Sequence, residues 1–88
     1  MQKNQYFILS KDEITKIVEY DGEIFGEYDT KEMPIEKIIK DEKQIPSFMI
    51  DSVSIFMTRK RIIYDNANFS LNYIGEFDSV FKMKEYYM

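Results

Sequence analysis

Histidine and cysteine are both absent from this chain of 88 residues. Without them the chain lacks the commonest general base, a thiolate nucleophile and the soft metal ligands. It also lacks the means to form a disulfide. The three glycines stand apart at Gly22, Gly26 and Gly75, so there is no glycine-rich phosphate loop. We therefore expect no catalytic residues, no metal site and no cofactor, and we predict a protein that binds a partner.

Carboxylates are the acid–base groups that remain. Adjacent acids such as Asp12 and Glu13 do not face each other in regular structure, and no spacing matches a calcium-binding loop. A second enzymatic alternative is a small ribonuclease that works without histidine, using arginine, lysine, tyrosine and glutamate. Such an enzyme needs a basic surface to hold RNA, whereas this chain has a net charge of −4. Direct binding of nucleic acid is disfavoured for the same reason.

Leucine and alanine are also scarce, with two and one occurrences against 13 isoleucines. Because β-branched and aromatic residues suit a pleated surface, the composition favours strands. The length predicts one domain spanning residues 1–88, and the hydrophobic content of 44% is sufficient for a core. The abundance of lysine, isoleucine and asparagine, whose codons are AT-rich, indicates a gene from a low-GC bacterium or from a phage or mobile element within one.

Long apolar runs are missing as well, since none approaches the roughly 20 residues that a membrane-spanning helix needs. The apolar stretch Tyr6–Leu9 is too brief for the core of a signal peptide. We therefore expect a soluble, cytoplasmic protein without membrane contact.

The first strand is predicted at Tyr6–Leu9. The segment that follows allows two interpretations: Ser10 and Glu13 fit a helical capping box, whereas the β-branched run Ile14–Tyr20 leads into Asp21-Gly22, which is typical of a hairpin. We favour the hairpin.

The register of this hairpin can be tested against the apolar pattern. A three-residue loop, Tyr20–Gly22 with Gly22 left-handed, pairs Glu19 with Glu23, Val18 with Ile24, and Ile17 with Phe25. A two-residue loop instead mixes charged and apolar side chains on both faces. Because a slip of one residue exchanges the faces of a strand, we expect the longer loop.

One helix is predicted at about 34–43, where Pro34 suits the first turn and Ile35, Ile38 and Ile39 form one apolar stripe. The remainder reads as a meander, with alternating strands near 52–58, 69–73 and 77–83, and a returning strand that places Ile62 opposite Met57 and Tyr64 opposite Ile55. Tight turns are expected at Arg59-Lys60 and in the segment 65–68. The predicted fold is therefore α+β: an antiparallel sheet of about five to seven strands with one helix packed on one face.

Acidic side chains are concentrated between Glu19 and Glu32. This segment contains six of them, and Lys31 is its one basic residue. Such a hairpin can simply be solvated, with charges that prevent edge-to-edge pairing. Alternatively it forms an electrostatic docking surface for a basic partner, in which Ile17 and Phe25 are either apolar anchors or side chains that the helix covers. The predicted partner-binding residues are Glu19, Asp21, Glu23, Phe25, Glu27 and Asp29.

Two further segments are candidate secondary contacts. The basic run Arg59, Lys60 and Arg61 is either a solvated turn or an anion contact, and the apolar end Tyr86-Tyr87-Met88 either packs a last strand or meets a partner. Arg59, Lys60, Arg61, Tyr86 and Tyr87 are therefore secondary candidates.

By analogy with small acidic proteins of mobile elements, the leading hypothesis is a non-enzymatic inhibitor of the anti-CRISPR, anti-restriction or immunity type. It would dock acidic side chains onto the basic nucleic-acid-binding site of a target protein such as a nuclease. The second hypothesis is a homo-oligomeric structural or accessory module, which includes a homodimer through a strand edge or the chain end. The third is a nucleic-acid-binding module or a small ribonuclease that works without histidine.

Overall fold

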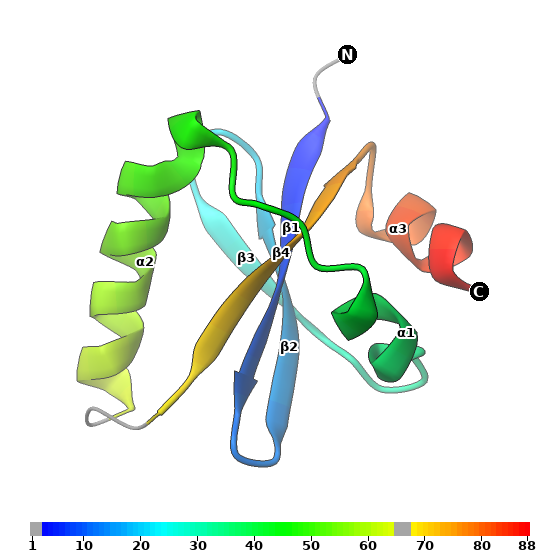
Figure 1. Ribbon diagram of the computed structural model, residues 1–88, viewed down its shortest axis with the longest axis horizontal. Coiled ribbons are helices and arrows are strands. Elements are labelled where there is room, and N and C mark those ends of the chain that lie inside the picture. Colours follow the sequence, from blue (N-terminus) through cyan, green and yellow to red (C-terminus); the bar gives the residue numbers. More distant parts are fainter. Residues whose placement is uncertain (1–2, 65–67) are drawn as a thin grey trace.

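The computed structural model describes residues 3–64 and 68–88 of the chain. Four antiparallel strands, β1 (Asn4–Lys11), β2 (Ile14–Tyr20), β3 (Phe25–Asp29) and β4 (Ser70–Phe77), form one sheet in the order β3-β2-β1-β4. Between β3 and β4 the chain forms α1 (Ile35–Lys40), a short 3₁₀ turn (Ser47–Met49) and α2 (Ile50–Ile63), and it ends in α3 (Val80–Tyr87). Figure 1 shows the sheet between α2 on one side and α1 with α3 on the other.

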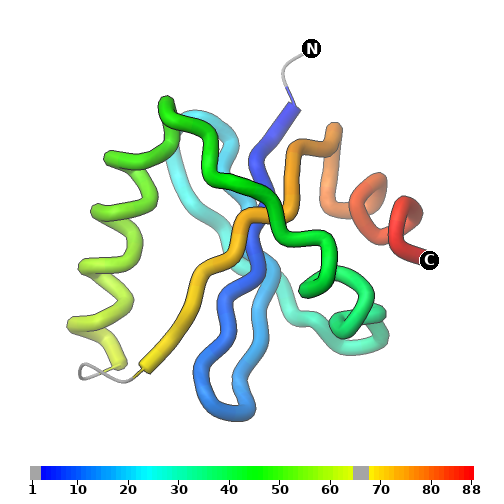
Figure 2. Tube along the Cα trace, in the orientation of Figure 1, coloured from blue at the N-terminus to red at the C-terminus, as the bar shows by residue number. Residues whose placement is uncertain are grey.

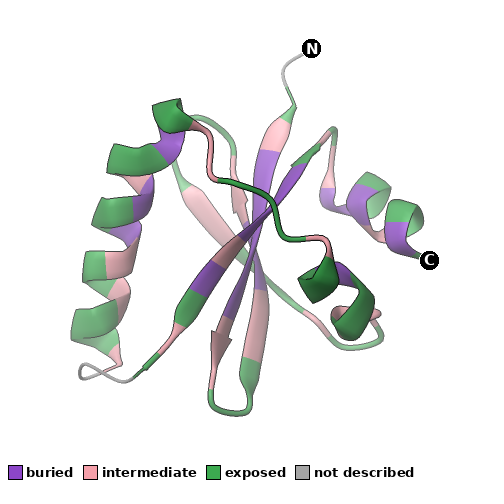
Figure 3. Cartoon of the chain, viewed as in Figure 1, coloured by how far each residue is buried: buried purple, intermediate pink, exposed green. Residues whose placement is uncertain are grey.

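The central strand β1 explains why both faces of the sheet are covered. Its five residues from Gln5 to Leu9 are all buried, so alternate apolar side chains point to opposite faces (Figure 3). Tyr6 and Ile8 pack with α1 and α3, through residues such as Ile38 and Met83. Phe7 and Leu9 belong to a second cluster, which α2 completes. A strand that is apolar on both faces therefore needs helices on both sides.

The α+β class and the antiparallel sheet are confirmed, whereas the predicted count of five to seven strands and one helix is wrong. The strand at Tyr6–Leu9, the strand Ile14–Tyr20 and the strand around Leu71 and Tyr73 are present, and the helix predicted at 34–43 is found as the shorter α1. The turn predicted at 65–68 lies largely outside the described residues.

The predicted strand and turn near 52–60, and the predicted returning strand through Ile62, form the helix α2 instead. Val53 and Ile55 alternate with serines as in a strand, but Val53 and Phe56 are the residues that α2 buries, at helical spacing. Packing of that pair against Phe7 and Leu71 decides the structure over the local β preference. Arg59, Lys60 and Arg61 consequently lie in the last turns of a helix.

The last predicted strand, 77–83, is also wrong beyond Phe77. Ser79 caps the N-terminus of α3, because its side chain accepts a hydrogen bond of 3.2 Å from the Lys82 N–H. From there Val80, Met83 and Tyr87 form a buried helical stripe. The apolar chain end thus packs as a helix and not as a strand.

The two edges of the sheet differ. At the β4 edge, the segment between α1 and the 3₁₀ turn runs alongside the strand, and the Lys43 N–H donates to the Tyr73 carbonyl at 2.7 Å (Figure 2). A bulge opposite Tyr6 and Phe7, with Gly75 at a φ of 126°, bends the same edge. At the other edge, β3 pairs with β2 only, among the residues described.

Candidate functional site: the hairpin–helix groove

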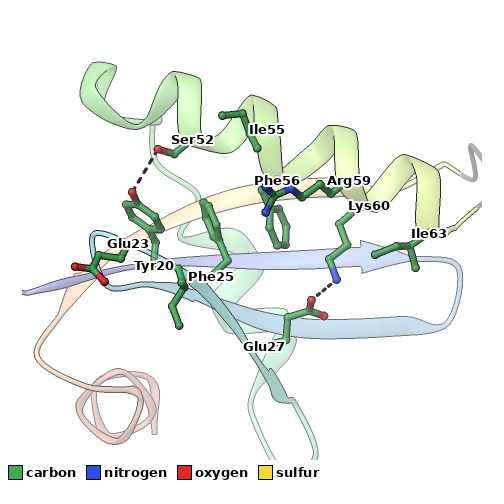
Figure 4. A pocket seen from close by; sticks show the side chains of 11 residues that line it. Tyr20, Glu23, Phe25, Glu27, Ser52, Ile55, Phe56, Arg59, Lys60 and Ile63 are labelled. Carbon is green, nitrogen blue, oxygen red and sulfur yellow. Dashed lines mark hydrogen bonds and ion pairs between the residues drawn. The ribbon is translucent and has the colours of Figure 1, made fainter.

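A groove of about 510 Å³ lies between the β2–β3 hairpin and α2 (Figure 4). We call it the hairpin–helix groove. The hairpin supplies one wall, formed by Tyr20, Glu23, Ile24, Phe25 and Glu27. The helix supplies the other, formed by Ser52, Ile55, Phe56, Arg59, Lys60 and Ile63.

The observed register of the hairpin creates this groove. Tyr20 pairs with Phe25, and Val18 with Glu27, around a four-residue turn at 21–24. The predicted pairing of Glu19 with Glu23, and of Val18 with Ile24, is therefore wrong by three residues, and a shift by an odd number exchanges the faces of β3. Phe25 now points toward α2, whereas the predicted register put it beside Ile17 on the other face.

Hydrogen bonds of Asp21 explain the longer turn. Its Oδ1 accepts from the N–H groups of Glu23 and Ile24, at 2.9 and 3.0 Å. These two bonds lower the pKa of the Asp21 carboxyl below its ordinary value. The Tyr20 hydroxyl donates to the Gly22 carbonyl at 2.9 Å, and Gly22 takes the positive φ that was expected of it. The turn is held in one shape by bonds at both ends.

Aromatic rings form the floor of the groove. The Phe25 ring lies 4.5 Å from the rings of both Tyr20 and Phe56, measured between centroids. Phe7 of the central strand lies 6.3 Å from Phe25. The hairpin is therefore attached to α2 through aromatic contacts that continue into the core.

An ion pair lies at the other end of the groove floor. Lys60 of α2 pairs with Glu27 of β3, with side chains only 13% and 29% exposed. The Lys60 ammonium also lies 5.3 Å from the centre of the Phe56 ring. Both residues were expected at partner-binding surfaces, but here they join the hairpin to the helix.

The structure divides the acidic segment between the two faces of the sheet. Glu19 lies on the face of α1 and α3, where it accepts hydrogen bonds from the hydroxyls of Tyr6 and Tyr28. Burial, followed by the bond to Glu19, raises the pKa of Tyr6 well above its usual range. Ile17, predicted as either an apolar anchor or a side chain covered by a helix, is fully buried on that face. Asp29 ends β3, where it accepts from the Lys31 N–H at 3.0 Å.

The groove contains one exposed carboxylate and one exposed guanidinium. Within the part of the chain that the structure describes, neither Glu23 at the turn nor Arg59 on α2 makes an ion pair. Around them stand Ile24, Ile55 and Ile63, which are 67%, 56% and 66% exposed. A partner can therefore bury apolar surface here and meet one charge of each sign.

The secondary candidates do not gather at one site. Arg59 and Lys60 line the groove, whereas the Arg61 guanidinium lies 5.9 Å from the Phe69 ring. Tyr87 is buried on the opposite face of the sheet, where its hydroxyl donates to Asp41 at 2.6 Å, and the neighbouring Tyr86 is exposed.

Sequence reasoning missed Ile24, Ile55 and Ile63 as candidate contacts. Ile55 and Ile63 are eight residues apart, which places them on a similar side of a helix. That spacing is informative only once the segment is known to be helical. Because 52–58 was interpreted as a strand, Ile55 and Ile63 were not recognised as side chains on the same side of a helix.

The comparisons with known proteins add no assignment: no family model matches the chain, and neither a curated protein nor a solved structure does so. In the described residues, no group of three or more acidic side chains is placed to hold a metal ion. No helix within those residues has the length and apolar character needed to cross a membrane.

Proposed function

We propose that this chain is a non-enzymatic binding protein that docks the hairpin–helix groove and its acidic turn onto a protein partner. The exposure of Ile24, Ile55 and Ile63 around one groove carries the proposal. Single exposed apolar side chains are common on protein surfaces, but three of them that line one groove are typical of an interaction site. In such sites apolar anchors supply most of the affinity.

The ordered turn supports the same function. Because Asp21 and Tyr20 already fix the turn, little conformational entropy remains to be lost on binding. The turn presents the carboxylates of Asp21 and Glu23 next to the exposed Ile24. An acidic tip with an apolar neighbour suits a basic surface on the partner.

The class of partner follows from this chemistry. We infer that the acidic turn takes the place of phosphates on a nucleic-acid-binding site, so that the chain inhibits a nuclease or a related enzyme. The net charge of −4 is compatible with a basic target and unfavourable for binding nucleic acid directly.

Site-specific photo-cross-linking tests the proposal. A photoreactive residue replaces Ile24 in one variant and Phe81 in another; Phe81 is 70% exposed but lies on α3, which packs on the opposite face of the sheet. The proposal expects one cross-linked protein from cells of the natural host with the probe at position 24, and none at position 81. The purified partner is then assayed for nucleic-acid cleavage with increasing amounts of the chain. Cross-linking only from position 81 contradicts the proposed site, and unchanged cleavage contradicts inhibition.

Self-association is the second candidate, and one observation favours it. Phe81, Tyr86 and Met88 leave large apolar areas exposed at the end of the chain. Sedimentation of the wild-type chain and of Phe81→Lys separates the alternatives. A dimer that Phe81→Lys dissociates supports association through α3, and a monomer at high concentration excludes it.

A further inference from the structure

The outer edge of β3 is open, and it borders the hairpin–helix groove. Among the described residues this strand pairs with β2 alone. Glu27 is exposed as a residue although only 29% of its side chain is accessible, so much of the exposed surface at this position is main chain. In an antiparallel sheet, alternate residues of an edge strand direct their N–H and C=O groups outward. β3 therefore offers unpaired main-chain groups.

We propose that β3 accepts an extended segment of the partner as a fifth strand of the sheet, with alternate side chains of that segment in the hairpin–helix groove. The inference rests on the proposed function and specifies how the partner is recognised. Main-chain pairing supplies affinity in this mode of recognition, and pockets for alternate side chains supply specificity.

The side chains around β3 define the chemistry of the segment. Apolar side chains of the segment fit against Phe25, Ile55 and Ile63. Among the described residues Arg59 and Glu23 make no ion pair, so the guanidinium of Arg59 calls for an acidic side chain and the carboxylate of Glu23 for a basic one nearer the turn. The predicted ligand is therefore an extended, largely apolar segment with one acidic and one basic residue at a fixed spacing.

A second copy of this chain fits the same edge poorly. If two β3 strands pair antiparallel over their full length, Glu27 stands opposite Glu27 and Phe25 opposite Asp29. Like charges directly across a strand pair are destabilising, and acidic side chains on an edge strand discourage such pairing. A segment with the complementary charges avoids both costs.

The edge of β4 provides no equivalent site. Lys43 occupies part of it, with its N–H on the Tyr73 carbonyl and its ammonium 3.1 Å from the Ile74 carbonyl. The bulge next to these residues interrupts the ladder further. The two edges of the sheet therefore differ: the β4 edge is partly occupied, whereas a strand can be added at β3.

Selection of peptides on the intact chain tests the inference. A phage-displayed library of random peptides is selected on immobilised wild-type protein, on Glu23→Lys and on Arg59→Glu. The expected peptides alternate apolar and polar residues, with an acidic and a basic residue at constant spacing. Selection on Arg59→Glu should replace the acidic residue by a basic one, and selection on Glu23→Lys should replace the basic residue by an acidic one.

An N-methyl scan of the best peptide then tests main-chain pairing. Methylation of alternate amides should weaken binding about tenfold, and methylation of the amides between them should have little effect. A flat N-methyl profile, or charge preferences that the two variants leave unchanged, overturns strand addition. A selection that enriches no peptide from the library also overturns strand addition.

The proposed function fails on a different result. If position 24 still cross-links a partner while the N-methyl profile is flat, the groove binds its partner without adding a strand. If no partner is cross-linked at position 24, the function itself is contradicted. A dimer with β3 amides protected from hydrogen exchange identifies a second copy as the occupant and overturns the inference.

Discussion

The ring of Phe25 in β3 lies 4.5 Å from the ring of Phe56 in α2, and their planes are inclined by 34°. This contact joins the edge of the sheet to the helix that covers one of its faces. Phe56 is buried, whereas Phe25 is partly exposed as the floor of the hairpin–helix groove. The groove is therefore built on core contacts, and its shape depends on the stability of the domain.

Truncation of Phe56 should destabilise the fold strongly. Replacing a buried phenylalanine by alanine removes apolar contacts and leaves a cavity, so we expect Phe56→Ala to lower the free energy of unfolding by about 3 kcal/mol. Urea denaturation measures the change. The matched control is Ile62→Ala in the same helix, where the side chain is exposed and the expected loss is below about 0.5 kcal/mol. Equal losses at the two positions would show that α2 does not pack through Phe56.

The ion pair of Lys60 with Glu27 should contribute a measurable coupling energy. Its side chains are largely shielded, whereas the pair of Lys82 with Glu85 on α3 is more than 60% exposed on both sides. A double-mutant cycle with Lys60→Met and Glu27→Gln is expected to give about 1 kcal/mol. The same cycle on Lys82 and Glu85 should give less than about 0.5 kcal/mol. A coupling energy near zero at both sites would show that the ion pair of Lys60 with Glu27 does not stabilise the contact between the hairpin and α2.

The bond between Tyr87 and Asp41 should make stability depend on pH at low pH. The Tyr87 hydroxyl, followed by the Lys43 ammonium, lowers the pKa of Asp41. Its stabilising contribution is therefore present above the unfolded carboxyl pKa of about 3.9, and it is lost as the pH falls through the lower folded pKa. In Tyr87→Phe the pKa of Asp41 should rise toward its ordinary value, and the free energy of unfolding should fall less steeply below about pH 4.

Carboxyl-carbon NMR titration of Asp41 measures the first effect and acid unfolding measures the second. Tyr86→Phe is the control, because Tyr86 is exposed. Burial also raises the pKa of Tyr87. The stabilising contribution of its neutral hydroxyl to the free energy of unfolding is therefore present below the unfolded tyrosine pKa of about 10 and is lost at higher pH. The same Asp41 pKa in wild type and Tyr87→Phe would contradict this assignment.

Charge reversal at Glu23 should weaken binding to the partner. Glu23 is exposed and its carboxylate makes no ion pair in the described residues, so Glu23→Lys changes the docking surface without removing a contact that supports the fold. Glu27 is unsuitable for this test because it pairs with Lys60. We expect at least a tenfold loss of affinity, and for the wild-type chain a loss of affinity as salt increases. The control is Glu85→Lys on α3, which should bind as wild type does; equal binding by both variants would exclude an electrostatic role for the turn.

The sequence predicted the elements whose local pattern and packing agree. Tyr6–Leu9 and the strand at Ile14–Tyr20 are β-rich in composition, and Pro34 with its isoleucine stripe marks α1. The segment that became α2 was mistaken because Val53 and Ile55 alternate with serines. Only the tertiary contacts of Val53 and Phe56 reverse that local preference.

The candidate site was predicted in part. Glu23, Phe25, Glu27, Arg59 and Lys60 all line the groove, but no local pattern in the sequence places the first three next to the last two. Glu19 was grouped wrongly with Phe25 and Glu27 because the three-residue error in register exchanges the faces of β3, so these two side chains lie on the opposite face of the sheet from Glu19. The bonds of Asp21 that decide this register connect residues only two and three apart, and an Asx turn was the available indication.

The affinity of the cross-linked partner for Ile24→Asp, compared with Phe81→Asp, tests the central claim most directly. Both substitutions place a carboxylate at an exposed apolar position, so neither should unfold the domain. Binding through the hairpin–helix groove predicts at least a tenfold weaker complex for Ile24→Asp and an unchanged one for Phe81→Asp. The opposite pattern, with Ile24→Asp binding as wild type does and Phe81→Asp binding weakly, would contradict the account.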